Sequence, residues 1–324
     1  MRDPDENGWH TLVAAHATER STLMTDPEVL VIGEALIDVV TTGVQEVEHV
    51  GGSPANVAYG LARLGVRTAL LTSIGDDARG GLIRTHLESA GVTVLPASIT
   101  PWRTSSATAR LDAAGSATYQ FDIRWELVET DNLPAASAVH VGSISAFLEP
   151  GASAVLKILR ARVGNELISF DPNIRPALVG DPDAARERFH SLVGLADVVK
   201  LSDEDADWLF PETSTDDVIS RILDYGADLV AVTRGGEGSR LATDSDRIDV
   251  PSYRVDVVDT IGAGDTYMAS LIASVRNLDV SALDTEALQR IGERAAAASA
   301  LTVSRAGAAL PSAEELDAAY PADA

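Results

Sequence analysis

The segment from Asp259 to Tyr267 combines two glycines with a carboxylate at the start of an apolar helical pattern. It reads Asp-Thr-Ile-Gly-Ala-Gly-Asp-Thr-Tyr. Glycines allow a tight backbone turn, and a helix that begins there directs free N–H groups and the positive end of its dipole toward an anion. Asp265 would then lie beside a bound phosphate and could accept a proton from an attacking hydroxyl group. The pattern alone fits phosphoryl transfer and fits a simple helix cap at Asp265 about equally well.

A second segment with two adjacent glycines lies in the first quarter of the chain. It reads Gly-Gly-Ser-Pro-Ala-Asn-Val-Ala over residues 51–58 and Leu-Ala-Arg-Leu-Gly over 61–65. In this order the two segments resemble the two signature motifs of the PfkB, or ribokinase-like, family of carbohydrate kinases. The resemblance extends from about residue 29 to residue 311 and is closest to fructokinase-like or 2-keto-3-deoxygluconate kinase-like members.

The resemblance implies roles for the residues at the second motif. Asp265 is then the catalytic base that removes the proton of a sugar hydroxyl group, and Gly262, Ala263 and Gly264 supply backbone N–H groups to the transferred γ-phosphate. Phosphoryl transfer depends mainly on positioning and charge stabilisation, so a base with oriented donors can carry it. A kinase is therefore compatible with the lack of a Gly-x-x-x-x-Gly-Lys-Ser/Thr sequence in this chain.

Residues around the first motif correspond to the sugar site of the family. Asp38, which follows Gly-Glu-Ala-Leu-Ile at 33–37, resembles the sugar-binding aspartate at the mouth of a lid, and Gly51, Gly52 and Asn56 would contact hydroxyl groups of the same substrate. An acidic acceptor, an amide that both donates and accepts, and bare backbone suit a polyol. Without the resemblance, Asp38 could be a turn residue at a strand end and Asn56 a helix-start residue.

The stretch Asp-Pro-Asn-Ile-Arg-Pro at 171–176 follows an apolar run at 167–170. It therefore emerges at the carboxyl end of a predicted strand, where open α/β sheets bind ligands. It resembles the Asp-Pro-Asn-x-Arg segment of the family, which implies that Asp171, Asn173 and Arg175 bind substrate. The planar guanidinium of Arg175 suits a sugar hydroxyl, a carboxylate or a phosphate. The alternative is a surface arginine in a proline-rich turn.

The run Lys-Leu-Ser-Asp-Glu-Asp at 200–205 also closes a predicted strand. In the family, an Asn-x-x-Glu pattern here organises magnesium and phosphate through water, and this chain departs from it with Ser202 and Asp205 in the outer positions. The resemblance implies that Lys200 and Ser202 contact ATP and that Glu204 and Asp205 hold Mg²⁺ through water. ATP phosphates supply most of the contacts of that ion, and an acidic helix N-terminus would have the same composition.

The loop Thr-Arg-Gly-Gly-Glu-Gly at 233–238 resembles the Thr-x-Gly-x-x-Gly nucleotide loop of the family. The resemblance implies ATP contacts from Thr233, Gly235, Gly236 and Gly238. A β-turn between two strands would use the same residue types.

Two further features of the family fall in the last quarter of the chain. The main-chain carbonyl groups of Asp259 and Ile261, with the loop at 305–308, are expected to hold a monovalent cation such as K⁺. The asparagine that usually lies near adenine on a late helix corresponds to Ala295 here.

Composition excludes several classes of protein. The 324 residues include no cysteine, and 25 basic residues stand against 49 acidic ones, for a net charge of −24. Such a surface repels phosphate backbones and anionic lipid, so neither nucleic acid nor a membrane is an expected partner. The lack of cysteine removes disulfides and thiolate chemistry and favours a cytoplasmic location. The six histidines show no metal-ligand spacing, and Gly-Ser-Ile-Ser-Ala at 142–146 lacks the last glycine of a nucleophile elbow.

The elements that must position these residues alternate along the chain. Apolar runs typical of strands buried on both faces occur at 29–33, 68–72, 138–141, 167–170, 197–201 and 229–233, with edge strands at 239–242 and 247–250. Helical spacing occurs at 54–64, 152–163, 184–192, 263–276 and 285–302. With right-handed crossovers this alternation predicts an α/β fold: a doubly wound, mainly parallel sheet with helices on both faces.

Two stretches interrupt the alternation. Residues 37–50 and 104–121 are rich in Thr and Val and alternate in polarity, and Ala-Ala-Gly at 113–115 predicts a turn. They predict antiparallel hairpins in a small β-sheet lid, with lid strands from about 35–50 and 97–125.

The expected domain organisation is simple. Residues 1–27 form a polar N-terminal extension in which Met24 is a candidate native start, and residues 28–324 form one ribokinase-like kinase domain. An exposed lid would invite aggregation unless it were covered. In some relatives two lids clasp each other, which implies a homodimer formed through the lid.

These observations lead to one main hypothesis and several alternatives. The chain is expected to be an ATP-dependent sugar kinase that uses Mg²⁺, with or without K⁺, and transfers the γ-phosphate to a hydroxyl group of a small sugar. Fructose is the first candidate, and 2-keto-3-deoxygluconate kinase and ribokinase activities are the enzymatic alternatives. Outside the enzyme class, the alternative is a non-catalytic regulator that binds a sugar or a nucleotide.

Overall fold

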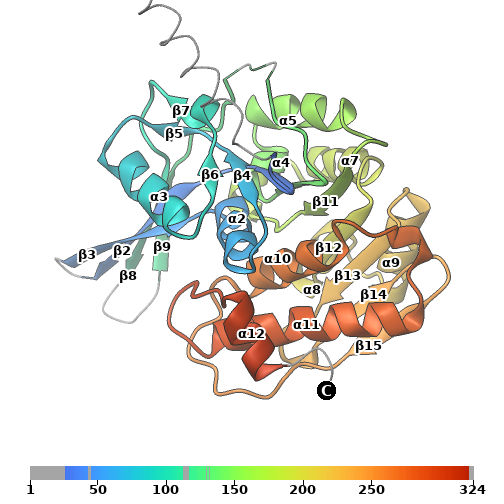
Figure 1. Ribbon diagram of the computed structural model, residues 1–324. Helices are drawn as coiled ribbons and strands as arrows, with labels where there is room; N and C mark the ends of the chain where they lie inside the picture. Colours follow the sequence, from blue (N-terminus) through green and yellow to red (C-terminus); the bar gives the residue numbers. More distant parts are fainter. Residues whose placement is uncertain (1–25, 43–44, 112–116, 129, 131, 321–324) are drawn as a thin grey trace, which may run out of the picture.

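The computed structural model describes residues 26–320 apart from 43–44, 112–116, 129 and 131. The expected extension at 1–27 therefore lies outside the described residues except for Asp26 and Pro27. A nine-stranded sheet runs through the molecule in the order β15-β14-β13-β12-β11-β10-β1-β4-β6 (Figure 1). Its strands are β1 (Val29–Ile32), β4 (Thr68–Leu71), β6 (Thr93–Val94), β10 (Ala138–Gly142), β11 (Leu167–Asp171), β12 (Val198–Ser202), β13 (Leu229–Thr233), β14 (Ser239–Ala242) and β15 (Arg247–Val250).

The direction of the strands confirms the predicted doubly wound, mainly parallel sheet. All neighbours from β13 to β6 pair in parallel, and only β14 and β15 are antiparallel. The chain passes from β1 to β4 on one side and later returns to β10 on the other. This reversal next to β1 is the place where open α/β sheets bind ligands, beyond the carboxyl ends of the strands.

Helices cover both faces of the sheet, as predicted, because the strand residues on each face are apolar. One face packs against α2 (Ser53–Arg63), α3 (Ala78–Ser89), α10 (Ala263–Val275) and α11 (Thr285–Val303), with α12 (Ala313–Ala319) outside α11. The other face packs against α4 (Ile144–Phe147), α5 (Gly151–Arg160), α7 (Pro182–Val193), α8 (Asp203–Leu209) and α9 (Thr215–Asp224). A short helix, α6 (Pro176–Val179), follows β11.

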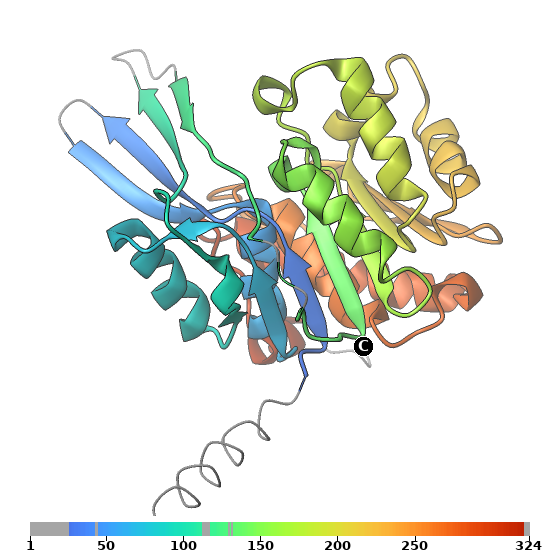
Figure 2. The same cartoon turned by 90° about the horizontal axis from the view of Figure 1, so that it is seen from above.

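A second sheet of four strands, called the lid here, projects from one edge of the molecule (Figure 2). Its strands, in spatial order, are β3 (Gln45–Gly51), β2 (Leu36–Thr42), β8 (Ser106–Leu111) and β9 (Ala117–Asp122). Both predicted hairpins are confirmed, since β2 pairs with β3 and β8 with β9 in antiparallel fashion. The parallel pairing of β2 with β8, which joins the hairpins, was not predicted.

The range of 97–125 was too wide for the lid. Part of it forms β7 (Ile99–Thr100), which pairs with β5 (Ile74–Gly75) in a separate two-stranded sheet. Among the described residues, no helix is long and apolar enough to cross a membrane.

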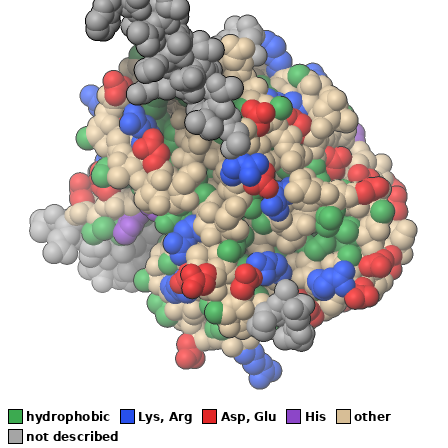
Figure 3. Space-filling model, viewed as in Figure 1, with side chains coloured by type: hydrophobic (Ala, Val, Ile, Leu, Met, Phe, Trp, Pro, Cys, Tyr) green, Lys and Arg blue, Asp and Glu red, His purple; other side chains and the backbone are tan. Residues whose placement is uncertain are grey.

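Charged side chains of both signs are interspersed on the face shown in Figure 3. Many are paired, as where Arg240 contacts both Asp216 and Asp249. Such exposed pairs contribute little to stability individually, but they reduce the repulsion that the excess of acidic residues creates.

Candidate active site

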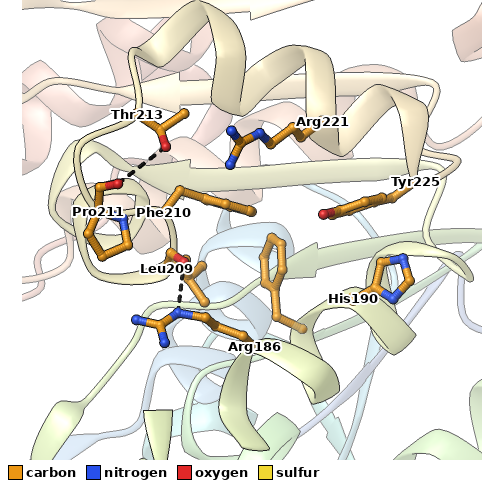
Figure 4. A pocket seen from close by; sticks show the side chains of 9 residues that line it. Arg186, His190, Leu209, Phe210, Pro211, Thr213, Arg221 and Tyr225 are labelled. Carbon is orange, nitrogen blue, oxygen red and sulfur yellow. Dashed lines mark hydrogen bonds between the residues drawn. The ribbon is translucent and has the colours of Figure 1, made fainter. Parts of the chain in front are cut away.

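A cavity of about 1290 Å³ opens at the carboxyl end of the main sheet. Its walls come from the ends of β1 and β10 to β13, from the lid and from the N-terminus of α10. A smaller cavity of about 370 Å³ lies between α7, α8 and α9 and is lined by arginine, histidine and apolar residues without a carboxylate (Figure 4). Because the larger cavity brings the carboxylate of Asp265 together with the glycine-rich turn before α10, the chemistry is assigned there.

Asp265 lies in the first turn of α10 and is 8% exposed. One carboxylate oxygen accepts a hydrogen bond from the Ser53 hydroxyl group at 2.6 Å, and the other accepts one from the Asn56 amide at 2.8 Å. Both donors stand at the start of α2, so the two sequence motifs meet at this carboxylate. The sequence predicted that Asn56 contacts the sugar. Asn56 borders the cavity, and its amide also orients the candidate base. Ser53 was not predicted.

The turn before α10 has the geometry of an anion site. Gly262 has φ = 79°, which favours glycine, and Gly262, Ala263 and Gly264 all border the cavity. The Ala263 N–H already donates to the Thr260 carbonyl at 3.3 Å. The following N–H groups of the first turn have no partner within the helix, because a helix leaves its first donors unpaired. The predicted anion-binding residues are thus together beside Asp265.

A buried ion pair lies beneath this turn. Lys200 Nζ is 2.9 Å from a carboxylate oxygen of Asp171, and the two side chains are 4% and 0% exposed. Burial opposes the charge of Lys200, but the neighbouring carboxylates of Asp171, Asp205 and Asp265 outweigh it and raise the pKa of Lys200. Lys200 borders the cavity next to Gly264, where an added Cβ would lie 3.1 Å from Nζ. A positive charge is therefore held beside the anion site.

Asp171 is not a cavity residue. The sequence predicted that it binds substrate, but it is fully buried behind Lys200 and is not among the described residues that border the cavity. Gly142 permits this arrangement, because a Cβ there would lie 2.3 Å from the Asp171 carbonyl oxygen. The role of Asp171 is to hold Lys200.

The lid end of the cavity carries Asp38 and Gly52, as predicted. A Cβ on Gly51 would lie 2.0 Å from Asp38 Oδ2, so Gly51 makes room for the carboxylate but does not itself border the cavity. Partial burial raises the pKa of Asp38, and the charges of His49 and Arg175 act in the opposite direction. This end can therefore accept hydrogen bonds from hydroxyl groups.

Arg175 and Asn173 border the same end of the cavity. The Arg175 guanidinium donates to the Asn173 side-chain oxygen at 2.7 Å and to the Ile174 carbonyl at 3.1 Å. Asn173 has φ = 36°, an uncommon backbone conformation that asparagine tolerates better than most residues. Asn173 therefore supports Arg175, and the guanidinium keeps further donors for a ligand.

Glu34 is a buried carboxyl group at this end that no motif indicated. It lies two residues beyond the end of β1, is 4% exposed and borders the cavity. Burial raises its pKa to about 7, against the effect of hydrogen bonds from its own backbone, the Ser143 side chain and Ser145. The signal available in the sequence was its position immediately after a buried strand.

The opposite end of the cavity collects the predicted nucleotide residues Ser202, Thr233, Gly235, Gly236 and Gly238. Asp205 also borders this space, but its carboxylate is already engaged by neighbouring groups. Its carboxylate accepts hydrogen bonds from the Ser202 N–H and hydroxyl group and from the Ile174 N–H at 2.7 Å, so it caps α8 and fixes a loop. Glu204 is exposed and borders the cavity. Of the two predicted magnesium residues, Glu204 is therefore the more available.

Within the described residues, no group of three acidic, histidine or cysteine side chains is arranged to hold a metal ion. Asp259, expected near a monovalent cation, accepts hydrogen bonds from the Ile261 N–H at 3.0 Å and the Gly307 N–H at 2.9 Å. These bonds lower the pKa of Asp259 and tie the two expected cation loops together. Ile261 borders the cavity and is 60% exposed.

The far wall at the nucleotide end is apolar. It is formed by Val255, Val257, Ala296, Ala300 and Val303, with Ser299 among them. The expected correspondence of Ala295 to a residue near adenine is wrong, because Ala295 is fully buried in the core. A helix turns by about 100° per residue, so the neighbouring Ala296 borders the cavity instead.

The chain is similar to known proteins in sequence and in fold. Residues 26–315 match the model of the pfkB family carbohydrate kinases. The chain is 36% identical over 279 residues to a fructokinase from Rhizobium leguminosarum bv. trifolii. This alignment covers 81% of the chain and 85% of the relative.

Two solved structures are also similar to the chain. The fructokinase of Xylella fastidiosa with bound ATP has a TM-score of 0.77 and 27% identity and covers 90% of this chain and 98% of that one. A double mutant of the fructokinase of Vibrio cholerae O395, in its fructose, ADP and potassium ion bound form, has a TM-score of 0.79 and 27% identity and covers 91% and 99%.

Proposed function

This chain belongs to the pfkB family of carbohydrate kinases and is an ATP-dependent sugar kinase, and we propose that fructose is its acceptor. The observation that carries the proposal is the position of Asp265. It stands between a sugar end with Glu34 and Asp38 and a nucleotide end with glycine loops. The relatives named as fructokinases cover most of the chain, which supports a fructokinase-like acceptor.

The geometry supports a direct transfer from ATP to the sugar. Asp265 accepts the proton of the attacking hydroxyl group, and the Ser53 and Asn56 hydrogen bonds hold both its oxygens in place. The N–H groups at the start of α10 and the ammonium of Lys200 stabilise the charge on the phosphoryl group as it moves. The lid strands stand over the sugar end, where they can exclude water and limit hydrolysis of ATP.

The charges at the sugar end favour a neutral sugar over a sugar acid. Glu34 and Asp38 provide two carboxyl groups there, and Arg175 is the one cation of that end among the described residues. A carboxylate or phosphate on the acceptor would face more negative than positive charge. The specific competing proposal is a 2-keto-3-deoxygluconate kinase, in which Arg175 would contact the substrate carboxylate.

Magnesium and potassium are proposed cofactors. Mg²⁺ bound to ATP would be held through water by the exposed Glu204 at the nucleotide end. When bound, this ion neutralises phosphate charge during transfer. The Vibrio cholerae relative was solved in a potassium-bound form, and here Asp259 fixes the equivalent expected loops, so we propose that a monovalent cation binds beside Ile261.

The lid supports a proposal of dimerisation. Val47 on β3 and Phe121 on β9 are large apolar side chains that are 50% and 37% exposed. A second lid packed on them would cover this surface and the unpaired edges of the sheet. We propose a homodimer through the lid that works in the cytoplasm without nucleic-acid or membrane partners. Light scattering at micromolar concentration should give twice the chain mass of 34.0 kDa, and a monomer would contradict the proposal.

ADP release from Mg-ATP tests the acceptor. The panel is fructose, ribose, 2-keto-3-deoxygluconate, tagatose 6-phosphate, fructose 1-phosphate, adenosine and inosine, each with and without potassium. We expect the highest kcat/KM with fructose. A higher value with 2-keto-3-deoxygluconate would assign the carboxylate role to Arg175. Silence across the panel by folded protein that binds ATP would instead favour a non-catalytic regulator.

A further inference from the structure

Glu34 stands at the point where the order of the parallel strands reverses. β1, which it follows, pairs with β4 on one side and β10 on the other. The carboxyl end of the sheet at such a reversal is where ligands bind in open α/β folds. Glu34 borders the sugar end of the cavity, together with Asp38, Ser143 and Ile144.

Close packing fixes the backbone around Glu34. A Cβ added to Gly52 would lie 2.5 Å from the Glu34 carbonyl oxygen, and one added to Gly33 would lie 2.8 Å from Ser145 Oγ. The Glu34 carboxylate accepts a hydrogen bond from the Ser145 N–H at 3.0 Å. The Trp125 indole donates to the carbonyl of the same Ser145 at 3.0 Å. The carboxyl group is thus held in place before any ligand arrives.

Holding the Ser145 backbone does not by itself require a carboxyl group, whose charge is unfavourable in a buried position. A glutamine could accept the same hydrogen bond from Ser145 without bringing a charge into a buried position. The hydrogen bonds that favour the ionised form of Glu34 come from backbone and serine groups rather than from an arginine or lysine among the described residues. The structure therefore holds a strong acceptor at the cavity wall that lacks a cationic partner. A sugar hydroxyl group would add a donor to those that the backbone, Ser143 and Ser145 already supply.

We propose that Glu34 is a further acceptor-binding residue, whose carboxylate accepts a hydrogen bond from a hydroxyl group of the bound sugar while it holds the backbone at Ser145. This inference rests on the proposed sugar kinase function. No covalent bond of the sugar changes in this step. A proton leaves Glu34 for solvent when the sugar binds near neutral pH, because the hydroxyl group favours the ionised carboxylate.

The pH dependence that follows has a definite sign. The free enzyme carries Glu34 with a pKa near 7, and the sugar-bound form has a lower one. Sugar affinity is therefore full above pH 7 and falls as the pH decreases below it, by about thirty-fold between pH 8 and pH 5.5 if the bound pKa lies below that range.

Other charged groups border the same cavity, and their effects must be separated from that of Glu34. Asp38 on β2, Asp265 on α10 and Lys200 on β12 border the cavity, as does Arg175 after β11. The exposed His49 lies opposite Asp38 in the β2–β3 pair. His49→Gln is therefore the matched control for Glu34→Gln.

The experiment measures KM for the sugar from pH 5.5 to pH 8.5, with the acceptor that the wild type uses best. We expect Glu34→Gln to raise this KM about 10–100-fold at pH 8, the usual effect of losing a charged hydrogen bond, and to remove the acid-side increase. His49→Gln should keep the wild-type profile, and KM for ATP should stay constant in all three proteins. A wild-type sugar KM and pH profile in Glu34→Gln would overturn the proposal.

A second measurement does not depend on the variant folding. Calorimetric titration of the wild type with the sugar at pH 7, in two buffers of different ionisation enthalpy, should show release of about half a proton per sugar bound. No release would overturn the role of Glu34. If the wild type phosphorylates an acceptor other than fructose, the proposed acceptor is wrong and the Glu34 test proceeds with that acceptor. The two failures are therefore distinguishable.

Discussion

Replacement of Asp265 by asparagine removes the candidate base with the least change of shape. The Ser53 hydroxyl group can still donate to Oδ1, which it now approaches to 2.6 Å. The new amide group faces the Asn56 amide, which donates to Oδ2 at 2.8 Å, so one hydrogen bond is lost at about 1 kcal/mol. Loss of a general base lowers the rate about 10²–10⁴-fold, which corresponds to about 3–5 kcal/mol of activation free energy. We expect kcat to fall about a thousand-fold.

The assay is ADP release at saturating sugar and Mg-ATP, with thermal unfolding as a check of the fold. Asp244→Asn is the matched control, because it removes an exposed carboxylate from the turn between β14 and β15, outside the cavity lining. The control should retain wild-type kcat, and Asp265→Asn should retain KM for ATP within about threefold, since ATP binding does not use the base. A loss of less than about tenfold in kcat, in a folded variant, would refute the assignment of Asp265 as the base.

Three further substitutions test the environment of the site and the packing of the C-terminus. Lys200→Met leaves Asp171 without the ammonium that lies 2.9 Å away. The free energy of unfolding, measured in urea, should therefore fall by about 3–5 kcal/mol. A change below about 1 kcal/mol would argue against a stabilising ion pair. Gly51→Ala places a Cβ 2.0 Å from Asp38 Oδ2. It should raise KM for the sugar at least about tenfold and leave KM for ATP constant. Equal increases in both KM values would contradict a local effect. The capping-box N–H and a neighbouring arginine lower the pKa of Glu315 to about 2. The stabilisation by its carboxylate is therefore present above the unfolded-state pKa of about 4.5 and is lost as the pH falls toward 2, so the Tm difference between wild type and Glu315→Gln should shrink over that range in calorimetry. A pH-independent difference would exclude this explanation.

Elements with a strong local signal were predicted closely from the sequence. The helix expected at 263–276 is α10 (Ala263–Val275), and the expected strands at 229–233, 239–242 and 247–250 match β13 to β15. β13 and α10 are rich in apolar residues, and β15 alternates polar and apolar residues, so the local pattern and the tertiary environment agree. The anion-binding turn followed from the same segment because all its residues are contiguous.

Among the helices that were not predicted, α3 and α9 were missed for different reasons. In α3, only Gly80, Ile83 and Leu87 are buried, which leaves a weak apolar face with adjacent glycines inside the helix. In α9, the buried residues Val218, Ile219 and Ile222 do follow helical spacing, and Ser214 caps the helix through the Asp217 N–H. The signal for α9 was therefore present in the sequence, whereas α3 depends on packing against the lid.

The contacts between side chains could not be predicted in the same way. Ser53 and Asp265 are 212 residues apart in sequence, and no local pattern states that one hydrogen-bonds the other. The direction of Asp171 likewise depends on Lys200 in the neighbouring strand, which takes its carboxylate away from the cavity. Residue type and position after a strand predicted which residues gather at the site. They did not predict which of them contact substrate and which hold another residue.

The position of Asp265 makes activity depend on the packing of two helices from opposite ends of the chain. Both donors that hold its carboxylate stand at the start of α2, and α2 packs on α10 so closely that a Cβ on Gly60 would lie 3.0 Å from the Ala269 Cβ. Movement of α2 by one ångström would leave the carboxylate in place but lengthen both hydrogen bonds. Misplacement of that size can lower the rate a hundred-fold. Gly60→Ala should therefore lower kcat at temperatures where the protein is still folded. A loss of activity that only follows global unfolding would show that the helices do not set the orientation of the base.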